Sequence, residues 1–284
     1  NKDGWNMYHG DKVPGFPKHP HRGFETLTVV DKGIIDHSDS LGASARYGDG
    51  DAQWLTAGDG INHAEMFPLF NLKNSNPIDF FQIWINLPSK NKRVSPYFSI
   101  FWDKDIPKVK YKDSRGVLTE VKVISGDYNS TKACEPPPNS WARDTSNNVA
   151  VWVIRIDKNG EWNIPKNDNN ILRSLYVAKG NNISINDQKI LPGNRIDLIP
   201  NHNIKVQNNG KKTNLLLLQG KPIKEPVVQY GPFVMNTKAE IQEAFNDYNQ
   251  TKFGNWNWET SAPVHGNKKE RFARLIDGSI EKPT

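Results

Sequence analysis

The residues best suited to chemistry in this sequence include a closely spaced pair of histidines. Residues 15–26 read GFPKHPHRGFET, which places His19 two residues before His21 and six before Glu25. Successive side chains of a β-strand point to opposite faces, so residues an even number apart share a face. We therefore expect His19, His21 and Glu25 to lie on one face wherever this segment is extended. Pro20 between the histidines fits an edge strand or the entry to a strand, where its missing N–H is harmless.

A second segment repeats this spacing with different donors. Residues 54–66 read WLTAGDGINHAEM, so His63 and Glu65 are again two residues apart, after a tight turn that Gly58 and Gly60 allow. Inward side chains of neighbouring strands in a barrel face one another, so the two pairs can converge. The predicted metal ligands are His19, His21, His63 and Glu65.

Three imidazoles and a carboxylate suit a divalent transition metal. With open coordination positions this donor set is typical of non-haem Fe(II) centres that react with oxygen, while Mn, Co, Ni, Cu and Zn accept similar donors. A single H-x-H is often a coincidence, and the second pair is what favours a metal site here. The four other histidines are interpreted as surface or hydrogen-bonded structural residues; they are His9, His37, His202 and His265.

The elements that must position these ligands are short strands. Runs of β-branched and aromatic residues lie between turn signals at 24–30, 80–87, 149–156, 175–178, 196–199 and 215–219. They occupy both halves of the chain, on either side of a proline-rich stretch at 136–138. This pattern predicts an all-β fold of two barrels or sandwiches in tandem.

A single helix is predicted near the end of the chain. Thr237 and Glu240 form a capping box, and apolar residues repeat at helical spacing over 241–248. Its apolar stripe is expected to dock on the barrels. Beyond Gly254 no period is visible, and we expect an extended tail.

Composition narrows the classes of partner and compartment. The net charge is +6, but basic and acidic residues alternate without a compact basic stretch, so direct nucleic-acid binding is not favoured. The apolar runs are far shorter than the ~20 residues of a membrane span. Cys134 is the one cysteine, which excludes an internal disulfide and a thiolate cluster and is compatible with a reducing compartment. We expect an intracellular protein, cytoplasmic or, in a eukaryote, nuclear. Because the chain begins with Asn1 rather than Met, removal of a targeting segment is an open alternative.

The first histidine segment resembles the first motif of the cupin superfamily, G-x(5)-H-x-H-x(3,4)-E-x(6)-G, with altered glycine spacing. More narrowly, the segments HPHRGFETLT, GDGDAQWLTAGDGINHAEM and EPVVQYGPFVMNTKAEIQEAF are similar to the pirin family, over residues 16 to about 253. The resemblance implies two tandem cupin, or jelly-roll-like, barrels. The expected domains are a metal-binding barrel at 1–118, a metal-free barrel at 119–235, and a helix with an extended tail at 236–284.

The resemblance also implies one iron in the first barrel, at His19, His21, His63 and Glu65. Cupins commonly take a ligand from the first-motif glutamate, whereas pirins take a carboxylate from the second motif. Glu25 is therefore expected either to orient a histidine by hydrogen bonding or to be an alternative ligand.

Some pirins resemble quercetin 2,3-dioxygenases, which implies an oxidoreductase that acts on a flavonol with O₂. Glu65 is then the expected catalytic base, and Phe24, Trp54 and Phe81 are the expected aromatic walls of the substrate pocket. The alternative is a non-enzymatic, iron-dependent and redox-sensing binding protein that regulates transcription through a protein partner. A third reading is a cupin acting on a different small molecule.

Overall fold

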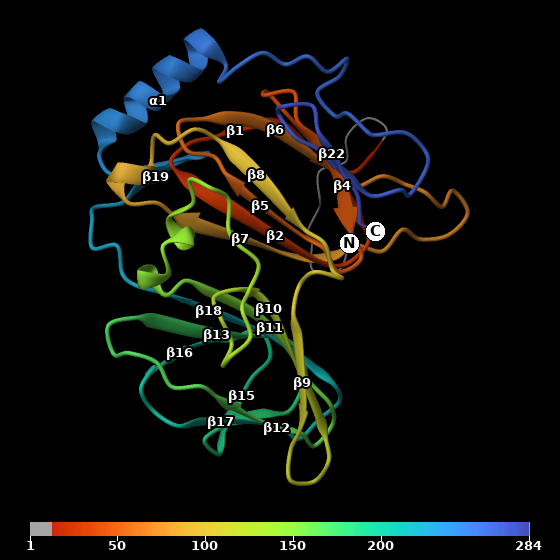
Figure 1. The fold of residues 1–284 in the computed structure, drawn as a ribbon, viewed down its shortest axis with the longest axis vertical. Helices are drawn as coiled ribbons and strands as arrows, with labels where there is room; N and C mark the ends of the chain where they lie inside the picture. The colour runs from red at the N-terminus through yellow and green to blue at the C-terminus, as the bar shows by residue number, and fades with distance from the viewer. Residues whose placement is uncertain (1–12, 284) are drawn as a thin grey trace. The chain divides into compact units, whose positions relative to one another are not determined.

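The computed structural model describes residues 13–283, and these fold mainly into antiparallel strands (Figure 1). The chain divides into two compact units. The first comprises the chain up to Lys104, the segment Pro137–Trp141 and the chain from Lys224 onward, and the second comprises Asp105–Pro136 and Ala142–Ile223. In Figure 1 the second unit is the part coloured from yellow-green to cyan. The predicted all-β class is confirmed.

The first unit is built from two main sheets. One has the order β1-β6-β3-β4-β21-β22, and the other has the order β7-β2-β5-β8. The strands of the first sheet are β1 (Gly15–His21), β6 (Ile61–Met66), β3 (Ile34–Asp39), β4 (Ser44–Gly48), β21 (Phe272–Arg274) and β22 (Ile280–Glu281). Those of the second are β7 (Asp79–Asn86), β2 (Phe24–Lys32), β5 (Ala52–Thr56) and β8 (Tyr97–Phe101). Apolar side chains from both sheets form one buried cluster that includes Ile35, Leu55 and Phe98.

The second unit also has two sheets, around a core that contains Trp152 and Trp162. Their orders are β16-β13-β18-β11-β10-β9 and β12-β17-β14-β15. The strands of the larger sheet are β16 (Arg195–Leu198), β13 (Leu172–Lys179), β18 (Thr213–Gly220), β11 (Ala150–Ile156), β10 (Leu118–Ser125) and β9 (Lys108–Lys112). Those of the smaller are β12 (Glu161–Ile164), β17 (Ile204–Asn208), β14 (Ile183–Ile185) and β15 (Gln188–Ile190).

Short elements complete the description. A two-stranded ribbon pairs β19 (Val228–Tyr230) with β20 (Phe233–Met235), and the 3₁₀ turns are η1 (Ser89–Asn91), η2 (Trp141–Arg143) and η3 (Thr145–Asn147). The predicted helix is confirmed as α1 (Lys238–Thr251), with Thr237 and Glu240 making both bonds of the capping box. No helix in the described part of the chain is long and apolar enough to cross a membrane.

Each run predicted as a strand lies at a strand in the structure, with ends that differ by up to three residues. The tail expected to be extended contains two short strands, and β21 pairs with β4. The limits 1–118, 119–235 and 236–284 remain a prediction about domains; the compact units follow the chain differently, because the first includes segments from three parts of it.

Candidate metal centre

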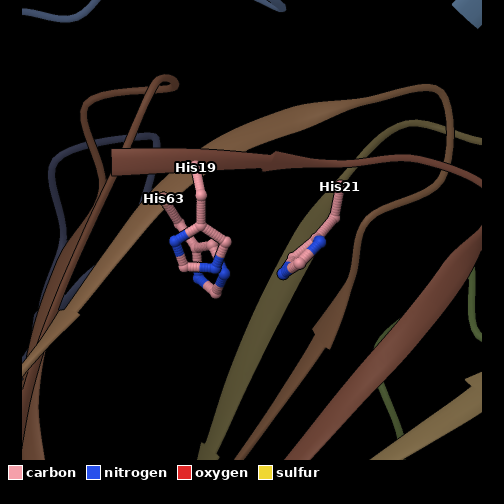
Figure 2. A group of neighbouring side chains, drawn as sticks. All are labelled: His19, His21 and His63. Carbon is pink, nitrogen blue, oxygen red and sulfur yellow. The ribbon is translucent and has the colours of Figure 1, made fainter. Parts of the chain in front are cut away.

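Three predicted ligands meet where β1 pairs with β6. The two strands are antiparallel, and His19 lies directly opposite His63 in their register. His21 follows two residues after His19 and projects to the same side (Figure 2). Each histidine offers a ring nitrogen within 4.8 Å of those of the other two. The alternation that predicted a shared face for these histidines is therefore what brings them together.

The protonation states of these rings suit metal binding. Burial and the neighbouring His19 lower the pKa of His21 to about 3. Burial and the surrounding histidines hold the pKa of His63 well below its ordinary value. Both rings are thus neutral at physiological pH, with lone pairs available without proton release.

Several ring nitrogens of the histidine group lack hydrogen-bond partners, which bears on whether a metal fits between them. His21 Nδ1 and both ring nitrogens of His63 are buried and have no hydrogen-bond partner. His19 donates from Nδ1 to the carbonyl oxygen of Pro17 at 2.8 Å, which fixes the tautomer and leaves Nε2 as the acceptor atom. Buried polar atoms without partners are costly, and a cation between these rings would satisfy one nitrogen of each ring.

Glu65 lies beside the three histidines. Its Oε2 is 4.0 Å from Nε2 of His63, and its carboxylate accepts hydrogen bonds from the Gln82 amide at 2.9 and 3.1 Å. The hydroxyl of Thr28 donates at 3.4 Å. Gln82 lies on β7 and Thr28 on β2, so the second sheet fixes a carboxylate that the first sheet carries.

Glu25 does not share a face with the histidines, and that expectation was wrong. The strand ends at His21 and the next begins at Phe24, with a turn at Gly23 in the positive-φ region, so the alternation is not continuous. Glu25 accepts from Thr56 Oγ1 at 2.6 Å and from Ser140 Oγ at 2.9 Å. Burial raises its pKa to about 7, and these hydroxyl donors oppose the rise.

The predicted aromatic walls are divided between the two faces of the second sheet. Phe24 faces the histidines, with its ring centroid 4.9 Å from that of His21. In the register of β2 with its neighbours, Leu27 pairs with Trp54 and Val29 pairs with Phe81. Trp54 and Phe81 therefore share the face of Glu25 and lie on the other side of the sheet from Phe24.

Two further aromatic side chains lie near the site. Trp84 on β7, which was not predicted there, has its ring 5.5 Å from that of His21. His37, interpreted as a surface or hydrogen-bonded structural residue, is hydrogen-bonded: its Nε2 is 3.1 Å from Asp39 Oδ2, and it is fully buried with its ring 5.4 Å from that of His63. The signal was present, because His37 and Asp39 have the same two-residue spacing as the ligand pairs.

The remaining histidines stand apart from the three-histidine group. His202, in the second unit, is exposed and pairs with the side chain of Asn201. His265 contacts the backbone carbonyl of His37 at 2.8 Å, and His9 lies outside the described residues. In the described part of the chain, His19, His21 and His63 are the one group of three or more metal-binding side chains.

Comparison with known proteins agrees with this geometry. A family described as "Pirin" matches residues 2–85, and one described as "Pirin C-terminal cupin domain" matches residues 151–254. Human pirin is 34% identical over 88% of this chain and 81% of its own. Pirin-1 of Arabidopsis thaliana is 36% identical over 84% of this chain and 78% of its own.

A solved structure extends the likeness to the fold. The crystal structure of quercetin 2,3-dioxygenase from Acinetobacter baumannii is 32% identical, superposes with a TM-score of 0.76, and is matched over 88% of this chain and 83% of its own. Three findings support one family assignment. The chain has two cupin halves, it carries the histidine group, and its relatives are matched over most of their own length. The chain belongs to the pirin family.

Proposed function

We propose that this protein is an iron-binding bicupin dioxygenase that oxidises a flavonol with O₂, as a quercetin 2,3-dioxygenase does. The observation that carries the proposal is a group of three imidazoles, two of them buried with depressed pKa values, next to a buried carboxylate. The solved structure at 32% identity, which is titled quercetin 2,3-dioxygenase, supports the substrate class.

The ligands we assign are His19, His21, His63 and Glu65. A bound Fe(II) would supply a Lewis acid and a redox centre with open positions for substrate and oxygen. Mn, Co, Ni, Cu and Zn are compatible with the same donors. The chain contributes neutral imidazoles and a fixed tautomer at His19, so that binding costs little reorganisation.

Glu65 is the residue we assign as base for the flavonol hydroxyl. Its carboxylate is buried, and hydrogen bonds from Gln82 and Thr28 orient it while leaving it unprotonated and able to accept a proton. A hydroxyl bound next to His63 could pass its proton to a Glu65 oxygen, since this carboxylate lies within 4.0 Å of that ring. Glu65 can serve as ligand and base in turn only if its bond to the metal is weak.

The test is anaerobic loading with Fe(II), followed by exposure to air with quercetin while flavonol absorbance is recorded. We expect consumption that depends on iron and is absent in His63→Ala. Loss of flavonol no faster than with the apoprotein would reject the enzymatic proposal.

The second candidate is a non-enzymatic and redox-sensing protein that binds a regulatory partner. Loss of flavonol no faster than with the apoprotein would favour it. The observation in its favour is the burial of the site, since the His21, His63 and Glu65 side chains are almost fully enclosed. A change in metal oxidation state there would be read through packing rather than through turnover. Flavonol consumption is the measurement that separates the two candidates.

A further inference from the structure

Trp84 is an aromatic residue that no part of the ligand scheme uses. It lies on β7, where it pairs with Thr26 of β2, two residues beyond Gln82, which pairs with Thr28. Gln82 and Thr28 both hydrogen-bond to Glu65. Trp84 therefore stands on the face of the second sheet that looks toward the metal centre.

The indole of Trp84 packs against two rings and is still partly exposed. Its centroid is 4.4 Å from that of Phe24, with the ring planes inclined by 34°, and 5.5 Å from that of His21. Phe24 is buried beneath it, yet Trp84 itself is 43% exposed. A large apolar ring that stays half exposed beside a buried polar site is informative, whereas an isolated exposed apolar residue is not.

The distances indicate what could cover that ring. A donor atom bound to a metal at His21 would lie within about 4 Å of the imidazole nitrogen, since each metal–ligand bond is about 2 Å long. The Trp84 ring lies 5.5 Å from the His21 ring, so a flat ligand whose oxygens reach such a metal could also contact the indole. Offset or edge-to-face contact between aromatic rings adds affinity beyond the area buried.

We propose that Trp84 is a specificity-determining residue that stacks against a planar aromatic ligand whose oxygens reach the metal. The assignment rests on the proposed function and deepens it: the substrate class is set by a ring platform of Trp84 over Phe24. Phe24 remains part of this platform, while Trp54 and Phe81, on the other face, contribute nothing to it.

The experiment measures binding without turnover. The Fe(II)-loaded protein is titrated anaerobically with quercetin and separately with acetohydroxamate, a metal ligand without a ring. The variants are Trp84→Ala and Trp84→Phe, and the matched control is Leu172→Ala, which removes a large apolar strand side chain that is 67% exposed and belongs to the second compact unit. Iron content is determined for each.

We expect Trp84→Ala to weaken quercetin binding by about ten-fold or more, and Trp84→Phe by about three-fold or less, because stacking is retained. Acetohydroxamate affinity and iron content should be the same in all four proteins, and Leu172→Ala should match the parent with both ligands.

Equal quercetin affinity in the parent and Trp84→Ala would overturn the inference, as would an equal loss of acetohydroxamate affinity or failure of the parent to bind quercetin. These results are separable from failure of the proposed function. Binding that depends on Trp84, without consumption of quercetin in air, would reject the dioxygenase and retain the platform. Consumption of quercetin by the parent, with unchanged binding in Trp84→Ala, would reject the platform and retain the dioxygenase.

Discussion

Gln82 lies outside the proposed ligand set and orients one of its members, Glu65. Its amide nitrogen reaches both oxygens of Glu65, at 2.9 and 3.1 Å. In Gln82→Leu the buried carboxylate loses its main donor and its fixed orientation. We expect metal affinity to fall by about 10- to 100-fold, the usual cost of removing such a partner.

Competition with a chelator measures this affinity. Gln188→Leu, at an exposed position on β15, is the matched control and should bind metal as the parent does. An unchanged affinity in Gln82→Leu would show that the amide does not orient Glu65 for the metal.

Glu25 provides a prediction about pH. Its pKa is raised from 4.5 to about 7 by burial, so the folded protein holds this proton more tightly than the unfolded chain. The contribution of Glu25 to stability is therefore fully present below about pH 4.5 and is lost as the pH rises through about 7. In Glu25→Gln, which can still bond to Thr56 and Ser140, that loss is absent.

Urea unfolding of both proteins at several pH values tests this. The difference between their unfolding free energies should change by on the order of 3 kcal/mol from pH 4.5 to pH 8, in favour of the variant at high pH. Stability curves that run parallel across this window would contradict the assignment.

For single residues, sequence spacing predicted those placements that depend on the alternation of side chains along a strand. His19, His21 and His63 converge because each ligand pair lies within one continuous strand. Glu25 was misplaced because its distance from His21 was counted through a turn. Trp84 was missed because a residue's exposure and its neighbours across the sheet are set by tertiary pairing, which spacing along the chain does not reveal.

Among the elements of the fold, the turn between β1 and β2 decides which side chains face the histidine group. Gly23 has φ of +83°, and a Cβ at this position would collide with the carbonyl oxygen of Val234. The buried ammonium of Lys92 bonds to the carbonyl oxygens of both residues, at 2.9 and 2.8 Å. The end of β1 is thereby fixed to β20.

Gly23→Ala should destabilise the protein by more than about 2 kcal/mol, because left-handed strain and a backbone collision add. Gly42→Ala is the matched control: Gly42 has φ of +84° with open space around its Cβ, so only the strain of about 1 kcal/mol applies. Urea unfolding compares the two. Equal losses of stability would show that the contact with Val234 is easily relieved.

The predicted strands and helix were largely right, but their neighbours were not predictable. Alternation and turn residues mark a strand locally, whereas the partner of an edge depends on contacts far apart in sequence. Thus β21 pairs with β4. The tail also forms hydrogen bonds near the histidine strands: the backbone N–H of Lys18 donates to the carbonyl oxygen of Ser261, and the indole of Trp258 donates to the carbonyl oxygen of Asp39.

At the scale of the whole molecule, the histidine group belongs to one compact unit. All three rings lie in the unit that contains β1 and β6, while the described residues of the other unit include one histidine, the exposed His202. We therefore expect one tightly bound metal ion per chain. His63→Ala should retain none, and His202→Ala should retain one.

Elemental analysis after dialysis gives these stoichiometries. Two ions per chain in the parent would require a second site, and one retained ion in His63→Ala would remove His63 from the ligand set.

The position of the bound metal directly tests the proposed ligand set. Crystals of anaerobically iron-loaded protein would be measured on both sides of the iron absorption edge. We predict one anomalous peak, about 2.0–2.2 Å from one ring nitrogen each of His19, His21 and His63 and from a carboxylate oxygen of Glu65. A peak at any other group of side chains, or none at these histidines in loaded protein, would rule out this ligand set.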